Sequence, residues 1–283
     1  TMTALLLLSG AHAADPSQIM PTVPTAPAVN ASIATGTLTN TAGASISKSW
    51  VDIKAPNADG ISHNQYSKFN VDSTTAAIIN NATSSSVVKS WTPTLRARNT
   101  GESDGAWQTY INSQTYSLGA NGNFTGAPLV PARVIINEVT ASNPSSLAGN
   151  LEIVGNAANL IIANPYGITV NGASFINAND VVLATGSIQN VSGNNVTFQL
   201  RNIPLTVLDP TTSGATSLSA TGLALISRQI NIAGKIEAEK LRVVANDGRA
   251  ILDTTTTIGT ITTNAIGALG GTVPSYAIDS SAL

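Results

Sequence analysis

Cysteine is absent from this chain of 283 residues, and charged and aromatic residues are scarce. Without cysteine the chain can form neither disulfides nor thiolate metal sites. Charged residues make up 10% of the sequence, against about 25% in a typical soluble domain, so uncharged polar side chains must cover the surface. The formal net charge of -2 provides no basic patch for nucleic acid, and we therefore expect no nucleic-acid partner.

Histidine is almost absent as well, which restricts the catalytic chemistry that the chain could support. Only His12 and His63 occur. His63 lies in a polar, strand-like context, which favours a hydrogen-bonded structural histidine over a member of a Ser-His-Asp triad. Acidic and basic residues are scattered singly without a calcium-loop spacing, and this argues against a polysaccharide lyase, whereas a glycosidase needs only two carboxylates and stays an alternative. We expect no catalytic residue, no metal site and no cofactor.

The first residues have the pattern of a secretory signal. An apolar core at residues 4–8 is followed by the small residues Ala11 and Ala13, which form a cleavage-like sequence. We interpret residues 1–13 as a partial signal peptide, residues 14–47 as a Pro/Thr/Ala-rich leader and residues 48–283 as one β domain cut from a longer protein. We therefore expect export to the periplasm, and no apolar run reaches the roughly 18 residues of a membrane-spanning helix.

Short apolar runs alternate with Asn, Gly and Asn-Pro turns from residue 132 almost to the end. The runs are rich in β-branched residues and too short for helices, so each is predicted to be a strand. The turn sequences include Asn143-Pro144 and Asn164-Pro165-Tyr166-Gly167, in which proline presets φ and glycine accepts a positive φ. The predicted strands include residues 134–136, 151–154, 160–162, 168–170, 181–183, 196–200, 205–208, 223–226, 229–232 and 240–244.

This rhythm favours a parallel β-helix, in which each coil stacks on the previous one about 4.8 Å along the axis. Asn and Thr at the coil corners can then form ladders, so the abundance of Asn need not indicate a ligand site. An antiparallel sandwich is the rival, although it would show hairpin signals at more regular spacing. Residues 61–71 resemble a capping strand or hairpin, and residues 92–126 are predicted to form a protruding loop or hairpin in which Trp107, Tyr110 and Tyr116 pack.

Several motifs, in order along the chain, resemble one family. The segments GISHNQYSKFNVDS, INEVTASNPSSLAGNLEIVG, ANLIIANPYGITVNGASFINA and LALISRQINIAGKIEAEKLRVVA are similar to the amino-terminal secretion domain of two-partner-secretion exoproteins. These exoproteins form the filamentous hemagglutinin and contact-dependent inhibition group. The resemblance implies an all-β fold, a right-handed parallel β-helix with an N-terminal β cap and extra-helical β elements.

The resemblance also implies a function. Such a domain is noncatalytic, engages the periplasmic POTRA domains of a dedicated outer-membrane β-barrel transporter of the TpsB type, and starts export of a long adhesin or toxin carrier. The exported protein is secreted or displayed on the cell surface, and its downstream regions contact host or neighbouring cells. A glycan-binding adhesin module is the alternative function, and a lyase or glycosidase is a weaker one.

The resemblance assigns the secretion motif to two turns of this chain. Asn164-Pro165-Tyr166-Gly167-Ile168 matches the family's Asn-Pro-Asn-Gly-Ile, with Tyr166 in place of the middle Asn, and Asn143-Pro144 matches its Asn-Pro-Ser turn. A structural role in the turn competes with direct transporter contact for these residues. The family's Asn-Pro-Asn-Leu motif is expected to be lost or rearranged near residues 122–129. Val170 and Ala173 stand where many relatives have a cysteine pair.

Overall fold

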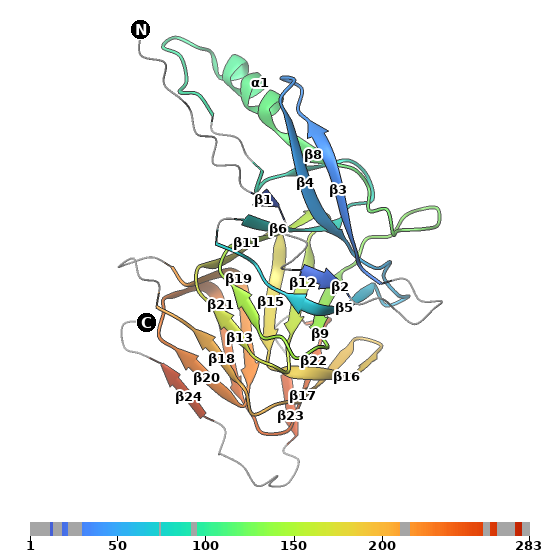
Figure 1. The fold of residues 1–283 in the computed structure, drawn as a ribbon, viewed down its shortest axis with the longest axis vertical. Helices are drawn as coiled ribbons and strands as arrows, with labels where there is room; N and C mark the ends of the chain where they lie inside the picture. The colour runs from blue at the N-terminus through green and yellow to red at the C-terminus, as the bar shows by residue number, and fades with distance from the viewer. Residues whose placement is uncertain are drawn as a thin grey trace.

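The protein is a parallel β-helix with three faces, as seen in a computed structural model that describes residues 12–13, 19–21, 30–73, 75–91, 95–209, 216–256, 261–264 and 275–278 (Figure 1). Strands of successive coils pair in parallel. The predicted fold class is thus confirmed, with its N-terminal cap and extra-helical elements, and the antiparallel sandwich is wrong. Residues 1–11 and most of the expected leader before residue 30 lie outside the described part of the chain.

Face 1 is the longest stack of strands. The two last strands are long enough to turn a corner, so that their first halves lie on face 3 and their second halves on face 1. Each strand pairs in parallel with the one before it, with one register shift between Ala158 and Leu160 where β12 meets β15, and no strand of this stack is interrupted by proline. In stacking order, face 1 contains β5 (Ile61–Phe69), β9 (Val134–Val139), β12 (Ala158–Ala163), β15 (Ala178–Ala184), β19 (Leu218–Ser227) and β21 (Ile236–Ala245).

Faces 2 and 3 complete each coil with shorter strands. The segment 61–71, expected to cap the fold, instead forms β5 and a first parallel bridge to face 2 at Val71. Face 2 contains β10 (Ser145–Leu147), β13 (Ile168–Val170), β18 (Pro204–Val207), β20 (Gln229–Ile232) and β24 (Ser275–Ile278). Face 3 contains β6 (Thr75–Asn81), β11 (Asn150–Gly155), β14 (Ala173–Ile176) and the first halves of β19 and β21.

The interior of the coil is aliphatic, as the low aromatic content requires. Strand residues alternate between the inside and the outside, and the parallel register places inward residues of neighbouring coils in columns. One such column, fully buried, consists of Ile135, Leu160, Val181 and Leu223. Each buried side chain of this kind contributes about 1.5 to 3 kcal/mol before the conformational entropy is subtracted.

Four strands from the N-terminal part of the chain close the first coil. β1 (His12–Ala13) and β4 (Ser45–Asp52) pair in parallel with β6, whereas β2 (Ile19–Pro21) pairs antiparallel with β5. β3 (Ser32–Thr39) forms an antiparallel hairpin with β4. The predicted boundary between the leader and the β domain, after residue 47, therefore lies inside this hairpin.

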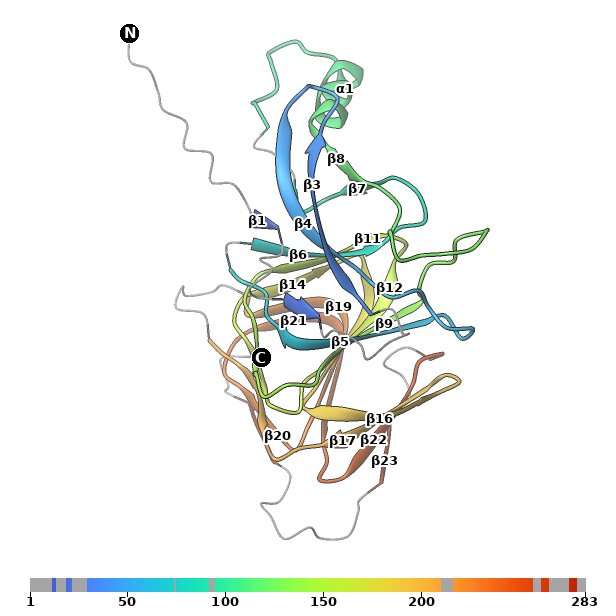
Figure 2. The same ribbon diagram turned by 45° about the vertical axis from the view of Figure 1, so that its right-hand side comes forward.

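An antiparallel sheet covers the outer side of face 1 (Figure 2). Residues 196–200, predicted to be a coil strand, are its second strand, and that assignment was wrong. Their alternating pattern suits one buried face, here formed against the outward residues of β9, β12 and β15. The sheet consists of β16 (Gly186–Ser192), β17 (Asn195–Leu200), β22 (Arg249–Asp253) and β23 (Ile261–Asn264).

The excursion between β6 and β9 contains a helix, whereas the sequence predicted a loop or hairpin. β7 (Ser86–Val88) and β8 (Tyr116–Leu118) form a small antiparallel sheet from which α1 (Asp104–Gln114) projects beside the β3–β4 hairpin (Figures 1 and 2). The helix has no buried residue, so no apolar periodicity marks it in the sequence. The predicted packing of the aromatic residues is confirmed, because Tyr116 is buried and Trp107 stacks on Tyr110.

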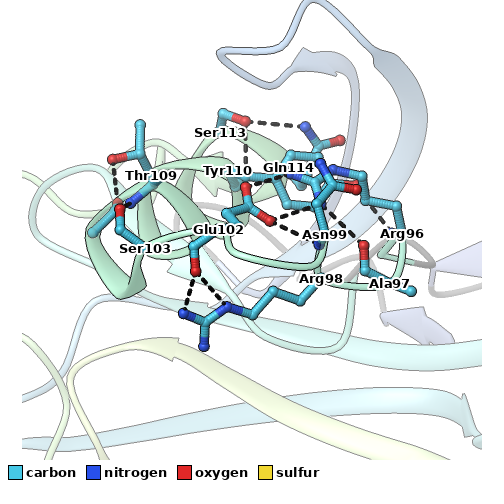
Figure 3. A network of polar contacts seen from close by, with 12 residues as sticks. Arg96, Ala97, Arg98, Asn99, Glu102, Ser103, Thr109, Tyr110, Ser113 and Gln114 are labelled. Carbon is cyan, nitrogen blue, oxygen red and sulfur yellow. Dashed lines mark hydrogen bonds and ion pairs between the residues drawn. The ribbon is translucent and has the colours of Figure 1, made fainter.

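α1 has no buried apolar face, and polar contacts fix its position instead (Figure 3). The Arg96 guanidinium binds both carboxylate oxygens of Glu102, at 2.6 and 3.0 Å, and lies over the rings of Tyr110 and Trp107. Arg96 thereby lowers the pKa of Glu102. The Ser103 hydroxyl caps the helix by accepting a hydrogen bond from the amide of Ala106.

Gly155 offers a sharp test of coil stacking. Its φ is +91°, and a Cβ added there would lie 2.4 Å from the Cα of Ala82. We expect Gly155→Ala to lower the free energy of unfolding by about 2 kcal/mol, because it adds backbone strain and a clash that no flexible side chain can relieve. Chemical denaturation measures this. Gly43→Ala is the control, since Gly43 has φ +86° but open space around it, and an equal loss in both variants would contradict the clash.

Candidate functional site: the Asn-Pro corner

The two turns predicted from the sequence stack on each other at the corner between faces 1 and 2. We call residues 143–144 and 164–168 the Asn-Pro corner. The Asn164 side-chain nitrogen donates to the backbone oxygen of Asn143 and to the Ser145 hydroxyl, both at 2.9 Å. The amide of Ser145 in turn donates to the Gly167 oxygen at 3.0 Å. All seven predicted motif residues, Asn143, Pro144, Asn164, Pro165, Tyr166, Gly167 and Ile168, therefore belong to one unit.

Asn164 organises this unit from a fully buried position. Its side-chain oxygen accepts from the Tyr166 amide at 2.8 Å, and its backbone oxygen accepts from the Gly167 amide at 3.2 Å. Gly167 has φ +113°, and Pro165 occupies the second position of the turn. The predicted structural roles of Asn164, Pro165 and Gly167 in the turn are thus confirmed, and the Asn164 side chain is unavailable for direct contact with a partner.

Asn143 and Ile168 anchor the corner on either side. The Asn143 side chain donates to the backbone oxygen of Ser67 at 2.7 Å, which ties the turn to the preceding coil. Ile168 is buried in the interior of the β-helix. The parts of the corner that reach solvent are therefore Asn143, Pro144, partly Pro165, and the ring of Tyr166, which is 38% exposed.

Polar side chains continue the line of Asn164 along the axis. The strand register aligns Asn164 with Thr185 and Thr185 with Ser227, all three fully buried. The hydroxyls of Thr185 and Ser227 are hydrogen-bonded to each other. The predicted corner ladder is confirmed, and it places a buried polar residue between faces 1 and 2 in three successive coils.

A third turn stacks on the corner and was not recognised in the sequence. Asn202-Ile203-Pro204 precedes β18, and a Cβ on Gly167 would lie 2.9 Å from the Ile203 side chain. Ile203 is 39% exposed. The available signal was an Asn followed closely by Pro just before a short apolar run, as in the other two turns, although here Ile203 separates the two residues. The β16–β17 hairpin separates this turn from its own coil, and so the regular spacing is lost.

A turn like the one at Asn164 lies at residues 121–124, at the start of the region where the family's Asn-Pro-Asn-Leu motif was expected to be lost or rearranged. The Asn121 side-chain oxygen accepts from the amide of Asn123 at 2.8 Å, and its backbone oxygen accepts from the amide of Phe124, the same pattern as at Asn164. The Asn121 amide group donates to the backbone oxygens of Ile53 and Asn80. The sequence here is Asn-Gly-Asn-Phe, so glycine and phenylalanine replace the proline and leucine of the family motif.

A buried carboxylate lies beside this turn. Asp52 accepts hydrogen bonds from the Asn80 side chain at 2.8 Å and from the Trp50 indole at 3.1 Å. Burial raises the pKa of the Asp52 carboxyl above its ordinary value, and the bonds from Asn80, Gly122 and Trp50 partly offset that rise. These contacts join the β3–β4 hairpin to the first coil, and they give Asp52 a structural role.

His63 and two buried glutamates make structural hydrogen bonds. His63 hydrogen-bonds Glu138 at 2.9 Å, which confirms the structural histidine, and Glu138 also accepts from the amide of Ile188. Glu152 accepts from the amides of Lys89 and Ser90. Within the described residues there is no group of three or more His, Cys, Asp or Glu side chains that could hold a metal ion. Among the described residues, no helix is long and apolar enough to span a bilayer.

Comparison with known proteins agrees with this architecture. The family model of the TPS secretion domain matches residues 24–283. The crystal structure of the filamentous hemagglutinin secretion domain is similar with a TM-score of 0.63 and 28% identity, over 94% of this chain and 74% of that chain.

Two long curated relatives are similar in sequence. The 16S rRNA endonuclease CdiA of Enterobacter cloacae is 34% identical over 270 residues, which cover 94% of this chain and 7% of the relative. Filamentous hemagglutinin of Bordetella pertussis is 30% identical over 244 residues, which cover 82% of this chain and 6% of the relative. The chain thus spans less than a tenth of these proteins, and it belongs to the TPS secretion domain family.

Proposed function

We propose that this domain directs a larger exoprotein across the outer membrane by binding the periplasmic POTRA domains of a TpsB-type β-barrel transporter through the Asn-Pro corner. The domain is noncatalytic and seeds folding of the β-helix that follows it. Its exoprotein reaches the periplasm through a signal peptide and is then secreted or displayed at the cell surface. Membership of the secretion domain family supports this proposal most directly.

The shape of the corner supports the proposed contact. Pro144 and Tyr166 are exposed, whereas Asn164 beneath them is buried and fixes the turn. The turn is therefore already ordered before a partner binds, and this reduces the conformational entropy lost on association. The nuclease name of the CdiA relative belongs to a far longer protein, and the family does not favour a lyase, a glycosidase or a glycan-binding module here.

The β-helix also supports the seeding role. Each coil buries its own aliphatic residues against the previous coil, so coils can fold one after another as the chain emerges. Each buried side chain adds about 1.5 to 3 kcal/mol before entropy, which can bias movement outward. Normal export of a variant whose coils cannot fold would contradict this part of the proposal.

Tyr166→Ala tests the transporter contact without disturbing the turn. We expect the affinity for the purified POTRA domains of the transporter to fall about tenfold or more, because exposed aromatic side chains often dominate interfaces. The free energy of unfolding should change by less than about 0.5 kcal/mol. Titration calorimetry and chemical denaturation measure the two quantities. Val87→Ala is the matched control, since Val87 is 50% exposed on the small β7–β8 sheet. Unchanged affinity in Tyr166→Ala would refute contact at this corner.

A further inference from the structure

The outer sides of the three faces differ in what covers them. A second apolar cluster joins face 1 to the β16–β17–β22–β23 sheet, with Phe198 at its centre. A third cluster joins the first coils of face 3 to β7 and β8. In the described part of the chain, no such cluster lies on the outer side of face 2. Among the described residues, face 2 is therefore the side of the coil with no apolar cluster on its outer side.

The strands of face 2 also carry no charged residue. The strands β10, β13, β18 and β20 contain no Asp, Glu, Lys or Arg. Their outward positions form a column of small polar residues, in which Ser146, Thr169, Thr206 and Asn231 are aligned by the strand register. By contrast, β21 exposes Glu237, Glu239 and Lys240 next to face 3. Charged residues are scarce throughout the chain, so the small polar residues of face 2 mark an interaction surface only together with the exposed apolar residues on its border.

Exposed apolar side chains border this column on both sides. Tyr166 and Ile203 lie on the corner that leads into face 2, and Leu208 lies directly after β18 on its far side. Their exposed fractions are 38%, 39% and 39%. Among the described residues, eight large apolar side chains are exposed, and these three share one face. Apolar side chains that gather around an uncharged sheet face indicate an interaction surface.

We propose that the outer side of face 2, with its border of Tyr166, Ile203 and Leu208, is the docking surface for the transporter's POTRA domains, which meet it through an uncharged, partly apolar surface. This inference rests on the proposed function, because the Asn-Pro corner is continuous with face 2 and one partner can cover both. Since no charge lies on the strands of face 2, association should depend little on salt. The proposed docking surface extends the contact from the two turns of the Asn-Pro corner to four coils.

Lysine substitutions in the outward column test this surface. Ser146→Lys and Thr169→Lys each place a charge on face 2 while the inward neighbours stay in the core. We expect each to weaken binding to the purified POTRA domains about tenfold or more, with little change in the unfolding midpoint. Thr221→Lys is the control, because Thr221 is exposed on β19 beside face 3. If Thr169→Lys loses stability, the exposed Ser146→Lys decides.

The outcomes separate this inference from the proposed function. Weakened binding in both face 2 variants, normal binding in Thr221→Lys and a salt-insensitive wild-type affinity support the docking surface. The docking surface is overturned if Ser146→Lys binds as tightly as the wild-type protein. It is also overturned if the affinity of the wild-type protein falls steeply between 50 and 500 mM salt, roughly a threefold change in Debye length. In that case, a loss of binding in Tyr166→Ala still supports the corner contact. Failure of the wild-type chain to bind POTRA domains would overturn both.

Discussion

Asn164→Ala is expected to lower the free energy of unfolding by about 3 kcal/mol. The substitution removes three side-chain hydrogen bonds, to Asn143, Ser145 and the Tyr166 amide. Each is worth about 1 kcal/mol net, and a buried group left without a partner costs about 1 to 3 kcal/mol. Chemical denaturation of the purified domain measures the loss.

Asn143→Ala is the control for this prediction. Asn143 is exposed, and its side chain makes one hydrogen bond, to Ser67, while its backbone oxygen remains available to Asn164. We therefore expect a loss of about 1 kcal/mol or less. If Asn164→Ala loses no more than Asn143→Ala, Asn164 does not organise the corner. If Asn164→Ala keeps its stability but loses affinity for the POTRA domains, direct contact gains support instead.

Phe198→Ala is expected to have the larger effect on stability, about 3 to 5 kcal/mol. Phe198 is fully buried between the extra-helical sheet and the outer side of face 1, so its removal leaves a cavity inside this apolar cluster. Val191→Ala is the control, because Val191 is only partly buried at the edge of the same cluster and should lose much less.

Hydrogen exchange shows which strands lose stability in Phe198→Ala. If the extra-helical sheet and the coil unfold together, amides of β17 and of β12 lose protection equally in Phe198→Ala. Faster exchange in β17 and β22 alone would mean that the sheet opens as a separate unit. A change below about 1 kcal/mol by denaturation, with unchanged exchange, would contradict the central place of Phe198 in the cluster.

The helix α1 illustrates what the sequence could not predict. Its N-cap Ser103 and the acidic Asp104 are local signals, yet none of its residues is buried and so no helical apolar period exists. Its neighbours are distant in the chain, because Ala42 of the β3–β4 hairpin donates to the oxygen of Ser113 at 3.0 Å. The Asn121 turn was missed because it lacks the proline of the other turns, and only the structure shows that its side chain donates to the distant backbone oxygens of Ile53 and Asn80.

The sequence by itself determined the short strands and the turns of the corner. The strand pattern favoured a parallel β-helix over an antiparallel sandwich, the family motifs implied the same coil, and the turn at Asn164 follows from contacts within four residues. Only the tertiary structure decided which runs leave the coil, as at β17, and which face of the coil stays uncovered. A strand with alternating residues suits a coil and a covering sheet equally well. Its place depends on the strand with which it pairs, which lies about 50 residues away in the sequence: Phe198 of β17 pairs with Ala250 of β22.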